Sequence, residues 1–239
     1  MMTATAPAPS PAAAVLRPIV AADTWRRTLH AVVGLATGVA WFTVLVTMLS
    51  LGAGMLITLV GIPILWLTAL VARDLIAPFE RAWASWALRV RVAAPPHRPP
   101  RGTGVISRMF APMADPATWR AVLYGLLQLP VGILTFTVTV TVWSTGLGLL
   151  SLPAWGWIDG VDVGWDGNRM DTWWEWVLPP VAGALLLVAA PWVVRGVTAI
   201  SDVMVRGLLG ARPADLRAEN AQLAARRDLA VDAAAATPP

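Results

Sequence analysis

Three long stretches without a charged side chain constrain this chain more than any other feature of its 239 residues. Residues 28–72, 121–158 and 176–194 contain no Asp, Glu, Arg or Lys. A helix needs about 20 apolar residues to cross the hydrocarbon core of a bilayer, whereas a soluble core has polar residues every few positions. The three stretches therefore predict an all-α integral membrane protein and exclude a soluble enzyme.

The lengths of these stretches and the positions of the arginines predict the number of spans. The first stretch is twice as long as one span needs, and Gly52 and Gly54 indicate a turn between helices near 28–50 and 54–72. The middle stretch could hold one span or two. With one span there, 17 of the 18 arginines lie on one side of the membrane, and such residues stay in the cytoplasm. The sequence thus predicts four transmembrane helices in the plasma membrane, with both termini cytoplasmic.

The second half of the chain repeats the first. With an offset of 94 residues, Thr24-Trp25-Arg26 aligns with Thr118-Trp119-Arg120, and Phe42-Thr43-Val44 aligns with Phe136-Thr137-Val138. The offset then grows to 122, where Arg73 meets Arg195 and Glu80 meets Asp202. Because each copy crosses the membrane twice, both copies have the same orientation. The fold class predicted is therefore two parallel-repeat hairpins, each followed by a cytoplasmic amphipathic helix.

The first amphipathic helix is predicted over residues 73–91. Apolar residues such as Leu75 and Phe79 recur there at three- and four-residue spacing, and Glu80 and Arg81 fall largely on the other face. This pattern is typical of a helix that lies at the inner membrane surface.

These features predict three parts of the chain. They are a disordered N-terminal tail (1–22), a four-helix membrane domain (23–210), and a cytoplasmic connecting helix with its tail (211–239). The membrane domain itself divides into repeat one (23–91), a proline-rich linker (92–114) and repeat two (115–210).

The increase in offset from 94 to 122 marks an insertion at the outer turn of repeat two. The insertion is rich in tryptophan and acidic residues, which could bind a cation, a cationic peptide or an envelope glycan. Alternatively, the tryptophans only anchor the outer interface. The candidate ligand-binding residues are Trp157, Asp159, Asp162, Trp165, Asp166, Asp171 and Trp173. The acids lack the alternating oxygen ligands of a Ca²⁺ loop, so no metal site is predicted.

Several short motifs occur in a fixed order along the chain. The Thr-Trp-Arg start and the Phe-Thr-Val helix are followed by Gly61-Ile62-Pro63 and Glu80-Arg81. In this order, from about Asp23 to Gly210, the chain resembles the sensor domain of actinobacterial two-component histidine kinases. The resemblance implies four spans and a cytoplasmic helix that leads into the dimerisation and phosphoacceptor region of a kinase.

Residues 214–236 resemble that connecting helix, and Pro213 suits its first position. Leu209, Leu216, Leu223 and Ala230 recur every seven residues, but their companion positions are polar. The pattern leaves dimerisation through this helix open, although the resemblance favours a homodimer.

No catalytic residues are predicted. The chain has no cysteine, its last histidine is His97, and it ends at Ala236-Thr237-Pro238-Pro239 without phosphoacceptor or ATP-binding boxes. The sequence predicts a non-catalytic input module in the lipid bilayer that binds no cofactor and no nucleic acid. It would relay a stimulus to a histidine kinase core, missing by truncation or supplied by another chain, or to another cytoplasmic signalling protein.

The alternative function is a small membrane scaffold or transporter subunit. Transport of ions normally places ionisable residues at mid-membrane, and none occurs within 31–72, 121–158 or 176–194. The sequence therefore favours the sensor over the transporter.

Overall fold

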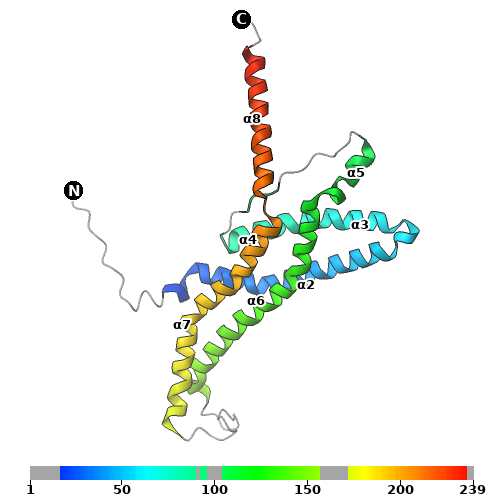
Figure 1. Ribbon diagram of the computed structural model, residues 1–239. Helices are drawn as coiled ribbons and strands as arrows, with labels where there is room; N and C mark the ends of the chain where they lie inside the picture. The colour runs from blue at the N-terminus through cyan, green and yellow to red at the C-terminus, as the bar shows by residue number, and fades with distance from the viewer. Residues whose placement is uncertain (1–16, 90–91, 96–103, 157–171, 236–239) are drawn as a thin grey trace, which may run out of the picture. The chain divides into compact units, whose positions relative to one another are not determined.

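The computed structural model describes residues 17–89, 92–95, 104–156 and 172–235, and every labelled element in these ranges is helical (Figure 1). The elements are α2 (Ala22–Gly54), η1 (Leu56–Thr58), α3 (Gly61–Leu70), the π-helical η2 (Val71–Ile76), α4 (Ala77–Ala87), α5 (Val105–Ala114), α6 (Pro116–Trp155), α7 (Trp173–Met204), the π-helical η3 (Val205–Leu209) and α8 (Pro213–Ala235). The predicted all-α fold class is confirmed.

Four of these helices are long and apolar enough to cross a membrane. They are Ala22–Gly54, Gly61–Ala87, Pro116–Trp155 and Trp173–Leu209. The third is one helix of 40 residues, so the middle charge-free stretch holds one span, as the arginine distribution predicted. Large apolar side chains on these helices are exposed, as expected where a helix faces lipid. The predicted architecture of four membrane-spanning helices is therefore confirmed by length and composition.

The turn between the first two spans lies later than the glycines predicted. Helix α2 continues to Gly54, and the chain reverses over residues 55–60, where Leu59 adopts a left-handed φ of 62°. Gly52 and Gly61 serve a different purpose, because a Cβ atom on Gly61 would overlap the carbonyl oxygen of Gly52. These glycines let two helices approach closely instead of making the turn.

Two further segments differ from the sequence-based expectation. The predicted surface helix over 73–91 continues the second span without a break, so that α3, η2 and α4 form one helix from Gly61 to Ala87. The π-helical turn of η2 lies just before Pro78 and accommodates its missing N–H donor. In addition, the proline-rich segment 92–114 contains the helix α5.

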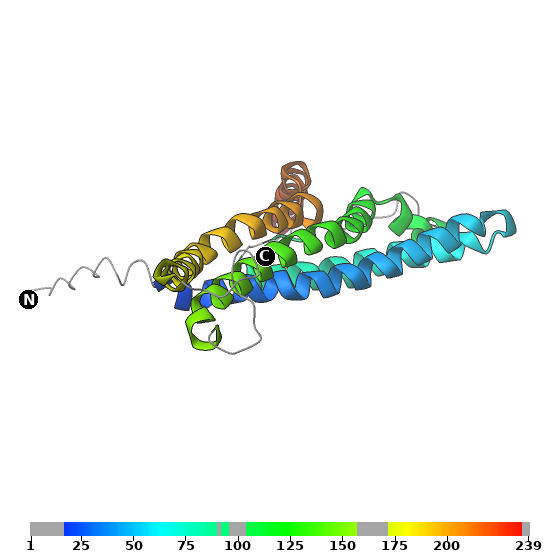
Figure 2. The ribbon, with the colours of Figure 1, turned by 90° about the horizontal axis from the view of Figure 1, so that it is seen from below.

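The chain divides into two compact units. Unit 1 contains residues 1–38 and 129–201, and unit 2 contains residues 39–128 and 202–239. Each unit therefore combines parts of both sequence repeats, since α2 and α6 each contribute to both units. Within unit 2, the two views show α3 folded back along the second half of α2 (Figure 1, Figure 2).

The same glycine contact holds together the hairpin in each unit. In unit 2, a Cβ on Gly52 would lie 2.7 Å from Leu65 Cδ2, and in unit 1 a Cβ on Gly146 would lie 2.8 Å from Leu187 Cδ2. These pairs align with one another at the offsets of 94 and 122 residues. The structure therefore repeats a packing contact where the sequence repeats its residues.

Candidate functional site: a buried carboxylate beside the exit of the C-terminal helix

The predicted outer ligand site falls mostly outside the described residues. Trp157, Asp159, Asp162, Trp165, Asp166 and Asp171 all lie there. Trp173 is described: it is the first residue of α7 and is 78% exposed. The ligand-binding role of this group stays a prediction.

The described residues beside that segment cap helix α7. The Glu175 carboxylate accepts a hydrogen bond from the Thr172 backbone N–H (3.0 Å), and the Glu175 N–H donates to the Thr172 carbonyl (3.1 Å). Thr-Trp-Trp-Glu is the sequence pattern of a capping box, in which the third residue after the cap binds back to it. Glu175 thus has a structural role at the start of α7.

A buried carboxylate lies at the centre of unit 2. Glu80 on α4 is 0% exposed. Its Oε1 accepts a hydrogen bond from Trp41 Nε1 on α2 (2.8 Å), and its Oε2 accepts one from the Tyr124 hydroxyl on α6 (2.9 Å). The Trp41 ring also packs edge-to-face against Phe79, with the ring centroids 5.8 Å apart. One carboxylate therefore connects three helices.

Hydrogen bonds to a buried carboxyl group determine how much its burial destabilises the fold. Removing an ionised carboxylate from water costs several kcal/mol unless hydrogen bonds and favourable charges compensate. Each oxygen of Glu80 accepts at least one hydrogen bond, and such bonds offset the cost of removing the group from water. The arrangement fixes the positions of α2, α4 and α6 more sharply than apolar packing alone would.

The burial of Glu80 reverses the expectation from the amphipathic pattern. The buried face of α4 carries Ala77, Glu80, Ala84 and Ala87, whereas the large side chain of Phe79 is exposed. A row of alanines at three- and four-residue spacing around an acid was the signal available in the sequence. It indicates close helix packing, in which Glu80 takes part, while the bulky residues face outward.

Within unit 2, helix α8 follows a short segment that is held on two sides. Arg120 Nη1 on α6 donates to the Gly210 carbonyl (3.3 Å), and the Ala211 N–H donates to the Ala93 carbonyl (3.0 Å). Leu209 is buried just before them, and α8 begins at Pro213, as its sequence predicted. We call residues 209–212 the exit segment.

The first turns of α6 connect the buried carboxylate to the exit segment. Arg120 and Tyr124 are four residues apart and so lie on one face of the helix, and the buried Gln128 follows at the same spacing. Arg120 holds Gly210, while Tyr124 holds Glu80. A displacement of α6 against α4 would therefore act on both contacts together.

In unit 1, partly exposed ion pairs connect the start of α2 with the C-terminal part of α7. Asp23 Oδ2 lies 3.2 Å from Arg27 Nε and 3.6 Å from Arg195 Nε, and Arg27 Nη1 donates to Thr198 Oγ1 (3.4 Å). These side chains are partly exposed, so their pairing is worth less than a buried one. In the described part of the chain, no group of three or more His, Asp or Glu residues could hold a metal ion.

The comparison with known families agrees with this architecture. The family model described as "Putative sensor" matches residues 30–209, which include Glu80 and Tyr124 and end at the first residue of the exit segment. No curated protein and no solved structure matches the chain significantly. The match confirms the predicted sensor domain and covers most of the sequence. The chain therefore belongs to this sensor family.

Proposed function

We propose that the chain is a non-catalytic, membrane-embedded input module of two-component signalling. It relays a stimulus through α8 to a histidine kinase core on the same polypeptide or on another. The observation that carries this proposal is the polar face of α6, where Arg120 bonds the exit segment of α8 and Tyr124 bonds the buried Glu80.

The relay works by a shift of packed helices. A stimulus in the bilayer, or at the segment before α7, changes how α6 packs against α4. Because Tyr124 and Glu80 hold one preferred register, the helices move between discrete arrangements instead of sliding continuously. Arg120 carries the movement of α6 to Gly210 and hence to the base of α8. Shifts of about 1–2 Å are sufficient in other helical switches.

The arginine distribution supports an orientation for this relay. Both termini lie in the cytoplasm and the four spans in the plasma membrane, because 17 of the 18 arginines then lie inside. Helix α8 consequently reaches its kinase core on the same side as the ATP that the kinase uses.

Exposed leucines on α8 support a dimeric output. Leu216 and Leu223 are seven residues apart, and both are exposed, Leu223 to 56%. Leu209, which begins the seven-residue pattern, is instead buried in unit 2. The dimer contact therefore begins within α8 itself and brings two kinase cores together.

The test joins residues 1–235 in frame to a kinase core that is active only when its entry helices are dimeric. One to four residues are inserted at the junction, and autophosphorylation is followed in membranes. We expect activity to vary with the inserted length at a helical period. Arg120→Gln should uncouple activity from deletion of residues 159–171, whereas Arg217→Gln, on the exposed surface of α8, should not.

Activity that ignores the junction length would contradict the relay. In that case the alternative function, a membrane scaffold or transporter subunit, would account better for the repeated helical arrangement of the two hairpins. Register dependence without any effect of deleting 159–171 would leave the relay intact and place the stimulus in the bilayer.

A further inference from the structure

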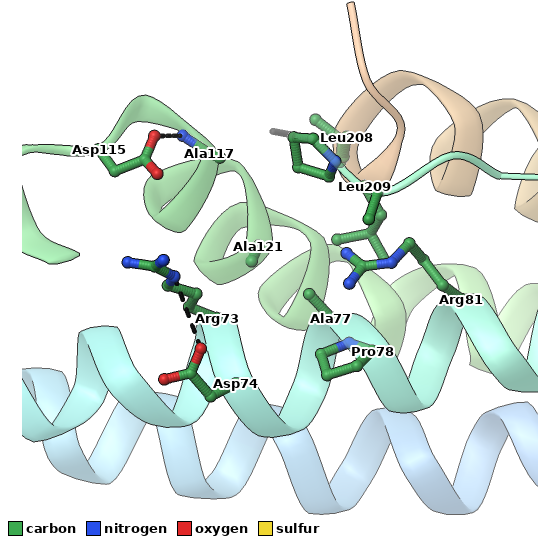
Figure 3. Close-up of a pocket in the computed structure, with 12 residues that line it drawn as sticks. Arg73, Asp74, Ala77, Pro78, Arg81, Asp115, Ala117, Ala121, Leu208 and Leu209 are labelled. Atoms are coloured by element: carbon green, nitrogen blue, oxygen red, sulfur yellow. Dashed lines mark hydrogen bonds and ion pairs between the residues drawn. The ribbon is translucent and has the colours of Figure 1, made fainter. Parts of the chain in front are cut away.

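A cavity of about 220 Å³ opens in unit 2 beside the exit segment. It lies between the start of α6, the α3–α4 helix and the end of η3 (Figure 3). Figure 3 shows the Arg73 side chain below the start of α6 and the Arg81 side chain beside Leu209. The residues that matter for its chemistry are Arg73, Arg81, Asp115, Ala117, Ala121 and Leu209.

The internal repeat explains why a cavity forms at this place. At the offset of 94 residues, Asp23 aligns with Ala117 and Arg27 aligns with Ala121. In unit 1 these two charged side chains pair with each other, and the Asp23 carboxylate also pairs with Arg195. Both alanines line the cavity in unit 2. Unit 2 therefore lacks the side chains that fill the equivalent place in unit 1.

Because Ala117 aligns with Asp23, Arg73 lacks the carboxylate partner that Arg195 has in unit 1. Arg195, which aligns with Arg73 at the offset of 122, lies 3.6 Å from Asp23. Within the described ranges, the ion-pair partner of Arg73 is its neighbour Asp74, 3.5 Å from Nε, and the Asp74 side chain is 60% exposed. A second cation lies in the same cavity, because Arg81 is half-buried and makes no ion pair among the residues that the structure describes.

The remaining acid of the cavity is already engaged. Asp115 Oδ1 accepts the Ala117 backbone N–H at 2.9 Å and so caps the start of α6 (Figure 3). The cavity thus presents two guanidinium groups, one of them with a weak partner, beside a capped helix start and the apolar side chains of Leu208 and Leu209. Such a set favours an anion that carries several oxygen atoms.

We propose that this cavity binds a phosphate group, which takes the place that the Asp23 carboxylate occupies in unit 1. The planar guanidinium matches two phosphate oxygens at once, and Arg73 and Arg81 can each offer such a pair of donors. The phosphate comes from a phospholipid headgroup or is free in solution. Binding does not depend on the proposed signalling function, although a ligand beside Leu209 would also steady the exit segment.

The test uses the full chain purified in detergent. Phosphatidylglycerol, diacylglycerol and inorganic phosphate are titrated separately while the thermal unfolding midpoint is followed, and native mass spectrometry counts bound phospholipid. We expect phosphatidylglycerol to raise the midpoint and diacylglycerol, which has no phosphate, to leave it unchanged. A rise with inorganic phosphate as well assigns the site to the phosphate alone. A rise with phosphatidylglycerol only assigns it to the lipid headgroup, and no rise with either overturns the proposal.

Variants based on the repeat separate the cavity from the rest of the surface. Arg73→Gln with Arg81→Gln should weaken binding roughly tenfold or more, since two charge-assisted contacts are lost. Arg195→Gln, the equivalent change in unit 1, should leave binding unchanged. Ala117→Asp with Ala121→Arg installs the unit 1 residues and should abolish binding while the chain still folds.

Two results would overturn the site. One is binding to the Ala117→Asp, Ala121→Arg variant as strong as to the unchanged chain. The other is an equal loss in Arg195→Gln, which would mean that any membrane-proximal arginine suffices. If the double glutamine variant unfolds, Arg81→Lys decides the matter. It keeps the charge but loses the planar fork, so we expect weaker phosphate binding with an unchanged unfolding midpoint without ligand.

Discussion

The two units keep the same hairpin contact but stabilise their helix ends differently. In both units a glycine packs against the leucine of the returning helix, at aligned positions. Unit 1 holds its helix ends with partly exposed ion pairs around Asp23. Unit 2 has a cavity in that place and holds its helices through the fully buried Glu80. The two units therefore share a packing contact and differ in the polar contacts of their helices.

The donors that hold Glu80 illustrate this divergence. Trp41, which bonds Glu80 in unit 2, aligns with Thr135 in the second repeat. The Thr135 hydroxyl bonds carbonyls of its own helix, those of Val131 (2.9 Å) and Gly132 (3.2 Å). The side chain that ties two helices together in one copy has become a local contact in the other.

The largest expected effect comes from removing the buried carboxylate. Glu80→Ala leaves the partly buried Trp41 N–H and the buried Tyr124 hydroxyl without this acceptor. We expect the free energy of unfolding to fall by about 3 kcal/mol, because each buried donor left without an acceptor costs about 1–3 kcal/mol. Titration with a denaturing detergent in mixed micelles would measure the change.

A matched variant sharpens this prediction. Glu80→Gln keeps one oxygen acceptor but turns an NH₂ group toward one of the two donors, so the loss should be intermediate. Trp41→Phe removes a single donor and should cost less than Glu80→Ala. If Glu80→Ala were as stable as the unchanged chain, the carboxylate would not be the contact that distinguishes unit 2.

The second-largest expected effect comes from disrupting the glycine contact that both hairpins share. A Cβ on Gly61 would overlap the Gly52 carbonyl oxygen, and a Cβ on Gly183 would lie 2.8 Å from the Gly146 carbonyl oxygen. Gly61→Ala and Gly183→Ala should each cost about 1–3 kcal/mol, since overpacking displaces the backbone. The two losses should be similar, because the positions are aligned.

Gly54→Ala is the control, since nothing lies within 4 Å of a Cβ built there. Unfolding of the three variants would be followed under one set of detergent conditions. A loss confined to one hairpin would show that the packing contact is not equivalent in the two units.

The sequence predicted the features that the bilayer imposes. Charge-free stretches fix the number of spans, because a membrane helix tolerates few charges whatever its neighbours are. The aligned motifs likewise predicted two related hairpins. The turn was misplaced because glycine serves both turns and close helix packing, and only the contact of Gly61 with Gly52 distinguishes the two.

The buried site depended on long-range partners that the sequence does not mark. From the sequence alone, Glu80 is predicted to lie on the polar face of an amphipathic helix. Its hydrogen-bond donors, Trp41 on α2 and Tyr124 on α6, are 39 and 44 residues away in the sequence. The cavity is harder still to predict, since Ala117 and Ala121 are unremarkable residues in any helix. Ala117 and Ala121 can be linked to a cavity only by comparison with the charged residues Asp23 and Arg27 at the aligned positions, and by the packing seen in the structure.

The smallest effect comes from making unit 1 more like unit 2. Asp23→Ala removes the carboxylate shared by Arg27 and Arg195. These side chains are partly exposed, so we expect a loss of about 0.5 kcal/mol at low salt and almost none near 1 M salt, where charges are screened within about 3 Å. The unfolding free energy of Asp23→Ala and the unchanged chain would be compared at both salt concentrations. A loss as large as that of Glu80→Ala, and insensitive to salt, would contradict the contrast drawn between the units. Asp23 would then act as a second buried anchor, and the cavity would remain as their main difference.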